Sequence, residues 1–195
     1  MNVNNQVSTG DAGVSTLNLT VQTIKLKTLE IGYTTTLEYL YCDANSLTTL
    51  DVSNNPALKS LDCYNSSLTT LDVSKNVNLE YLDISGSNLT TLDVSNNPAL
   101  KSLYCYGNSL EKLYLPVQNI SPVFSIFNNP NLTDIYTKRT SGTQTIYSNQ
   151  AQSSGKNNAS YTIHTLDGIG YPSMFSGTTY AVSGVPITYT VDSTP

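Results

Sequence analysis

Tyrosine side chains recur at regular intervals through the middle of the chain, and two aspartates recur with them. The tyrosines are Tyr39, Tyr41, Tyr64, Tyr81, Tyr104 and Tyr106, and the aspartates are Asp62 and Asp83. Tyrosine is amphipathic, costs little entropy to order and is over-represented at recognition surfaces. These eight residues are therefore candidate binding residues for a protein or a glycan. The alternative is structural, because tyrosine also favours strands.

A second regular set is acidic. Asp51, Asp72 and Asp93 lie 21 residues apart, and Glu30 occupies the same place one period earlier. Stacked carboxylates repel one another, and their oxygens suit calcium, which makes this ladder a candidate cation site. We favour the alternative that the carboxylates bond to neighbouring hydroxyls and water, because a linear ladder does not wrap around an ion. We therefore expect no metal and no cofactor.

Cysteine side chains also share one place in the pattern. Cys42, Cys63 and Cys105 follow the candidate binding residues by one position and are expected to point inward. Parallel side chains on stacked segments suit a disulfide badly, and no second set of metal ligands lies nearby. The sequence predicts three buried, reduced thiols that act as small apolar side chains.

All of these residues belong to an internal repeat. The segment LTTLDVSNNPALKSLDCYNSS, which starts at Leu47, differs from the one that starts at Leu89 at three of twenty-one positions. Each period divides into an eleven-residue half and a ten-residue half, and both follow LxxLxLxxNx, with the first leucine as position 1. The halves begin at Leu26, Leu37, Leu47, Leu58, Leu68, Leu79, Leu89, Leu100 and Leu110. Such a spacing indicates stacked repeats.

The pattern within each half predicts a short strand. Positions 4 and 6 are two residues apart and face the same side of an extended segment. The asparagine that follows can satisfy backbone groups that a bend leaves unpaired. Each coil is therefore expected to hold two extended segments, stacked in parallel on the next coil about 4.8 Å away. One coil cannot bury its inward residues alone, so neighbouring coils stabilise one another.

The nested 21-residue pattern resembles bacterial leucine-rich repeats, in the subtype found in Bacteroidetes surface proteins and internalin-like in general character. The resemblance covers residues 14–141. It implies a β-rich solenoid: a right-handed superhelix of 21-residue coils with a parallel sheet and almost no helix. It also implies a binding module for protein–protein interaction or adhesion. An extracellular or cell-surface location is implied as well, with neither signal nor anchor visible in this chain.

The composition argues against several functional classes. The chain has 195 residues, nine basic and fourteen acidic side chains, and a net charge of −5. A nucleic-acid binder would normally carry a basic stripe, so we expect no nucleic-acid partner. The sequence has no run of eighteen apolar residues, so it predicts no membrane span.

The sequence also lacks the patterns typical of an enzyme. It has no acid–base dyad in a cleft-like setting, no glycine-rich phosphate loop and no metal cluster. Parallel β-helix lyases also stack coils, but their coils are usually longer and carry insertions. We expect a non-enzymatic monomer that binds a protein rather than a glycan. Two alternatives stay open: a glycan-binding surface protein that uses the tyrosines as a platform, and a passive structural stalk.

Three parts are expected along the chain. Residues 1–13 are polar and predict an N-terminal leader, and residues 14–141 form the repeat array. Leucine nearly vanishes after Leu132, with only Leu166 remaining. Alternating apolar and polar residues then predict a few strands, so residues 142–195 are expected to form a β-rich cap or flank.

Overall fold

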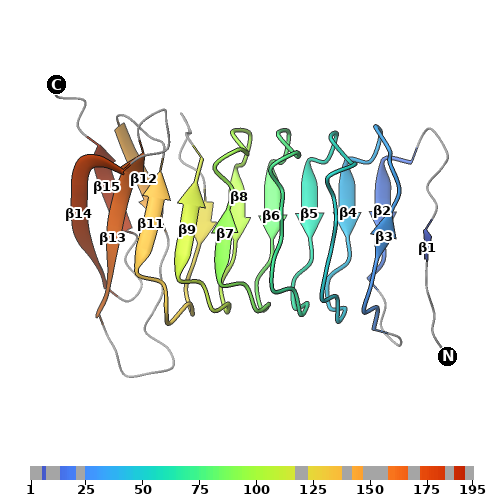
Figure 1. The fold of residues 1–195 in the computed structure, drawn as a ribbon, viewed down its shortest axis with the longest axis horizontal. Helices are drawn as coiled ribbons and strands as arrows, with labels where there is room; N and C mark the ends of the chain where they lie inside the picture. The colour runs from blue at the N-terminus through green and yellow to red at the C-terminus, as the bar shows by residue number, and fades with distance from the viewer. Residues whose placement is uncertain are drawn as a thin grey trace.

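The computed structural model describes residues 6–7, 14–20, 25–116, 123–137, 142–146, 158–166, 172–182 and 187–191. Within these residues the protein is a β-solenoid with parallel sheets and no helix, which confirms the fold that the repeat predicts. The coils stack side by side along the long axis of the molecule (Figure 1).

One side of the solenoid is a six-stranded parallel sheet in the order β10-β8-β6-β5-β4-β2. Its strands are β2 (Thr16–Asn18), β4 (Tyr39–Tyr41), β5 (Ser60–Asp62), β6 (Tyr81–Asp83), β8 (Ser102–Tyr104) and β10 (Val123–Ser125). Neighbouring strands pair without slippage, so that Leu40 pairs with Leu61 and Leu61 with Leu82. Equivalent positions of successive repeats therefore form straight columns.

The eleven-residue halves contribute to a five-stranded sheet in the order β14-β13-β11-β9-β7. Its strands are β7 (Thr91–Asp93), β9 (Lys112–Leu115), β11 (Asp134–Thr137), β13 (Asn158–Leu166) and β14 (Pro172–Val182). The pairing is parallel from β7 to β13, whereas β14 is antiparallel to β13. Residues 50–52 and 71–73 hold the same place in earlier coils without forming strands.

Two small sheets complete the described strands. β1 (Gln6–Val7) pairs in parallel with β3 (Glu30–Ile31). β12 (Gly142–Ile146) pairs antiparallel with β15 (Ile187–Val191).

The core is a stack of leucines. In the three-residue strands of the six-stranded sheet, the middle residue points inward and its two neighbours point outward. The middle residues Leu61, Leu82 and Leu103 are fully buried. The outward residues at positions 3 and 5 are thereby held in two parallel columns on the sheet surface.

The cysteines lie where the pattern predicts. Cys42, Cys63 and Cys105 are all fully buried and free, and Ile84 fills the same column. Their burial confirms the predicted inward position. Because burial disfavours the thiolate, it raises the pKa of the Cys105 thiol.

Asparagine side chains tie successive coils together at the turns. The Asn76 Nδ2 atom donates to the backbone carbonyls of Val52 at 3.0 Å and Asn55 at 2.9 Å. One coil further on, Asn97 donates to Val73 and Asn76, each at 2.9 Å. Asn76 and Asn97 are fully buried and so are these hydrogen bonds, so each amide satisfies carbonyls that water does not reach.

Candidate binding surface

The outward face of the six-stranded sheet carries most of the predicted binding residues. We call this set the tyrosine face: Tyr39 and Tyr41 on β4, Asp62 on β5, Tyr81 and Asp83 on β6, and Tyr104 on β8. Strand pairing puts Tyr39, Ser60, Tyr81 and Ser102 in one column, and Tyr41, Asp62, Asp83 and Tyr104 in the other. The first column therefore alternates large and small side chains.

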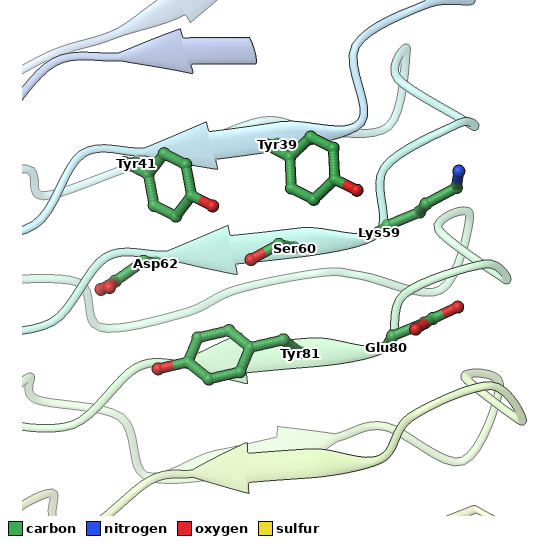
Figure 2. A pocket seen from close by; sticks show the side chains of 7 residues that line it. All are labelled: Tyr39, Tyr41, Lys59, Ser60, Asp62, Glu80 and Tyr81. Atoms are coloured by element: carbon green, nitrogen blue, oxygen red, sulfur yellow. The ribbon is translucent and has the colours of Figure 1, made fainter. Parts of the chain in front are cut away.

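A pocket of about 330 Å³ opens in the tyrosine face where this alternation leaves space. Its lining residues are Tyr39, Tyr41, Lys59, Ser60, Asp62, Glu80 and Tyr81. Figure 2 shows Tyr39 and Tyr41 on one side of Ser60 and Asp62, and Tyr81 on the other. The tyrosines thus form opposite walls, and the short Ser60 side chain lies between them.

The remaining predicted tyrosines form a separate aromatic row at the turns after the strands. Tyr64 and Tyr106 have ring centroids 6.4 Å apart, and Tyr106 stacks on Phe127 at 4.5 Å with an interplanar angle of 5°. Ser85 holds the equivalent position in the coil between Tyr64 and Tyr106, 21 residues from each tyrosine, and its side chain is small. The sequence grouped all six tyrosines together, whereas the structure divides them into a sheet group and a turn group.

Two carboxylates give the tyrosine face its charge. Burial is the main cause that raises the pKa of Asp62, and the neighbouring carboxylates of Asp83 and Asp43 add to it. The Tyr64 amide donates to Asp62 Oδ1 at 3.1 Å and opposes this rise. Burial, together with Asp83 and Asp62, also raises the pKa of Tyr81 to about 12, so its phenol keeps its proton at neutral pH.

The lysines beside the tyrosine face already have partners. The Lys59 ammonium lies 2.8 Å from a Glu38 carboxylate oxygen, and Lys101 lies 2.6 Å from Glu80. Within the described part of the chain, no such ion pair involves Asp62. The charge at the pocket that is not balanced by a neighbour is therefore negative.

The aspartates of the ladder, on the other side of the coils, accept hydrogen bonds from backbone amides in the turns. Asp51 Oδ1 accepts the Ser53 amide at 2.9 Å, and Asp72 and Asp93 accept the equivalent serine amides at 2.8 Å each. Hydrogen bonds from Ser53 lower the pKa of Asp51, and those from Ser74 lower that of Asp72. The described residues contain no group of three His, Cys, Asp or Glu side chains arranged to hold a metal ion.

Sequence reasoning missed an aromatic pair on the five-stranded sheet. Tyr114 on β9 and Tyr136 on β11 are paired in register, and their rings stack at 4.5 Å with an angle of 13°. Both lie at position 5, counted from Leu110 and Leu132, in the column that also holds Asp93. The column that begins with the aspartate ladder therefore ends in a stacked aromatic pair.

Residues 78–98 match the Leucine Rich Repeat family model. The match spans one period of the array, and it supports a leucine-rich repeat family for a chain whose other periods follow the same pattern. The Bacteroidetes subtype stays a prediction. No curated protein matches the chain.

The chain is also similar to a solved structure, described as "Functional domain of InlJ from Listeria monocytogenes includes a cysteine ladder". The two are 22% identical, with a TM-score of 0.41, over 66% of this chain and 45% of that one. The chain thus spans less than half of that structure's length. None of the described residues forms a helix long and apolar enough to cross a membrane.

Proposed function

We propose that the protein is a non-enzymatic binding module that holds a protein partner on the tyrosine face. A leucine-rich repeat suggests a protein-interaction module, and the repeat match supports that reading for this chain. The observation that carries the proposal is the pocket between Tyr41 and Tyr81, with an unbalanced carboxylate beside it. Adhesion at the cell surface is the setting that the resemblance implies, and we propose it on that ground.

The tyrosine rings are suited to binding because they are already held in place. Tyr81 and Tyr104 are half-buried, and their ring centroids lie 5.7 Å apart. A side chain that its neighbours already order loses little entropy when a partner covers it. Buried aromatic anchors commonly contribute about 2 kcal/mol or more each to an interface.

The matching surface of the eleven-residue halves is less suited to this role before the column reaches the Tyr114–Tyr136 pair. Thr70, Thr91, Asp72 and Asp93 are exposed there. Short polar side chains of this kind hold water well and bury little apolar area in a complex. The contrast between the two sides gives the proposal a matched control within one chain.

Selection of ligands from a displayed random-peptide library, with the full chain as bait, tests the proposal. Each selected peptide is then made with a photoreactive group, and its cross-links to the chain are located by mass spectrometry. We expect the cross-links to fall on β4, β5, β6 and β8. Cross-links confined to the Thr and Asp columns would reverse the assignment of the face.

The same bait distinguishes the two alternatives. If the library yields no ligand while neutral oligosaccharides bind and are displaced from the tyrosine face, the partner is a glycan. If neither peptide nor oligosaccharide binds, the passive-stalk hypothesis replaces the proposal.

A further inference from the structure

We propose that the pocket in the tyrosine face receives an arginine side chain of the protein partner, with Asp62 as its counter-ion. This inference rests on the proposed function, since it specifies the chemistry of the residue that the partner inserts.

The shape fits a flat group. Tyr41 and Tyr81 come from β4 and β6, which flank β5. Strands two places apart in a sheet are separated by about 10 Å, so a group above β5 lies about 5 Å from the strand on either side. Cation–π attraction acts within roughly 6 Å of a ring centroid, a distance that a group between these two strands can meet. Ser60 leaves this place open, because its side chain is much shorter than the tyrosines on either side.

The charge of the pocket favours a cation. Lys59 and Lys101 are engaged by Glu38 and Glu80, and neither ion pair includes Asp62. Asp62 is paired in register with Asp83, so the two carboxylates come from adjacent strands whose backbones lie about 4.8 Å apart. Burial and this repulsion both disfavour the ionised form of Asp62, and its pKa is raised accordingly. A bound cation relieves both effects at once, because it neutralises the carboxylate and replaces the lost water.

The hydrogen-bonding capacity favours arginine over lysine. The Tyr64 amide donates to Asp62 Oδ1 at 3.1 Å, which orients the carboxylate and leaves Oδ2 to accept from a ligand. A guanidinium group is planar, stacks on aromatic faces and is more weakly hydrated than an ammonium. It can lie between the tyrosine rings and donate to Asp62 in the same pose, whereas an ammonium offers no flat face to the rings.

Two short peptides that differ at a single side chain test this inference on the full chain. One peptide carries a single arginine among glycine and serine residues, and the other carries citrulline, the neutral isostere, in its place. Binding is followed through the backbone amide signals of Ser60, Asp62 and Tyr81 in the ¹⁵N-labelled protein. We expect the arginine peptide to shift these signals and to bind at least tenfold more tightly than the citrulline peptide.

Two variants separate the charge of the pocket from its shape. Asp62→Asn keeps an oxygen for the Tyr64 amide and removes the charge, and we expect it to weaken arginine-peptide binding at least fivefold. Ser60→Leu keeps every charge and fills the space between the walls, so it is expected to abolish the shifts. Ser102→Leu is the matched control, since Ser102 shares the column but does not line the pocket. Each variant's melting curve is recorded to establish that it is folded.

The outcomes separate this inference from the proposed function. Equal binding of the two peptides, or unchanged binding to the Asp62→Asn variant, overturns the arginine inference. If library-selected ligands still cross-link to the tyrosine face in that case, the proposed function stands without it. If a neutral oligosaccharide such as cellotetraose shifts the same amide signals and neither peptide does, the pocket binds a glycan and both proposals fail.

Discussion

The rings of Tyr81 and Tyr104 lie 5.7 Å apart at 44° on adjacent strands of the six-stranded sheet. The two residues are not in the same column, because Tyr81 is paired with Ser102 and Tyr104 with Asp83. Their contact is therefore diagonal across the sheet, which long aromatic side chains can span. The contact holds the two aromatic anchors of the proposed interface in a fixed relation beside the pocket.

The inward leucines are expected to dominate the stability of the array. Leu82 is the fully buried middle residue of β6 and packs between coils on both sides. Leu82→Ala should lower the free energy of unfolding by about 2–5 kcal/mol, because it removes buried methyl groups and leaves a cavity. Urea denaturation measures this change. Exposed Thr70→Ala is the control and should change it by less than about 0.5 kcal/mol.

A left-handed turn residue in each ten-residue half gives a second prediction. Ala44 has φ of 54° and Gly86, two coils later, has φ of 67°. An L-residue with a side chain is strained there, whereas glycine is not. Ala44→Gly should raise the free energy of unfolding by about 1 kcal/mol, and Gly86→Ala should lower it by a similar amount. Thermal melts of both variants measure this, and a loss of stability in Ala44→Gly would contradict the turn geometry.

The charge of Asp62 is expected to destabilise the folded protein at neutral pH. Its pKa is raised on folding, so the folded state holds this proton more tightly than the unfolded chain does. The penalty for ionisation is present above the folded pKa and disappears below the unfolded value of about 3.9. Asp62→Asn should therefore be more stable than wild type at pH 7, and the difference should close as the pH falls toward 4.

Asp72 should behave in the opposite way, which makes it the matched control. Hydrogen bonds from Ser74 lower its pKa, so its ionised form stabilises the fold above the unfolded pKa and this contribution is lost in acid. Asp72→Asn should be less stable than wild type at pH 7, and the difference should close below about pH 4. Denaturant melts at several pH values measure the stability difference between each of the two variants and the wild type. Parallel pH profiles for the two variants would contradict the account of the carboxylates.

The segment 142–195 is proposed to cover the last coil of the array. β13 continues the parallel sheet beyond β11, and Ile135 pairs with Ile163. Phe124, Ile126 and Ile135 are buried near this end of the array. Deletion of residues 142–195 should therefore expose apolar surface and lower the melting temperature or cause aggregation. A truncated chain that stays monomeric with an unchanged melting temperature would show that the segment is an independent tail.

The leucine period predicted the array because inward burial fixes the phase of every other side chain. Once Leu61 and Leu82 point inward, residues on either side of them must point outward, so the tyrosine columns followed from the sequence. The pocket did not follow, because it depends on which small residue lies between which large ones across coils. No sequence pattern marks Ser60 as a binding residue. It contributes to the pocket because the larger Tyr39 and Tyr81 side chains lie on the two neighbouring strands.

Two other features escaped sequence reasoning for a similar reason. The left-handed turn position is filled by Ala44, Asn65, Gly86 and Gly107, so no single residue type marks it. The stacked pair of Tyr114 and Tyr136 spans the last regular half and a degenerate copy. Conformations and contacts that arise between coils leave a weaker trace in the sequence than the burial pattern within each coil.

The affinity of a library-selected peptide for two matched double variants tests the central claim most directly. Tyr81→Ala with Tyr104→Ala removes the aromatic anchors, and Thr70→Ala with Thr91→Ala removes exposed side chains on the other side. Titration calorimetry on the folded full-length variants should give at least a tenfold loss of affinity for the tyrosine pair and little change for the threonine pair. A large loss for the threonine pair with none for the tyrosine pair would contradict the account.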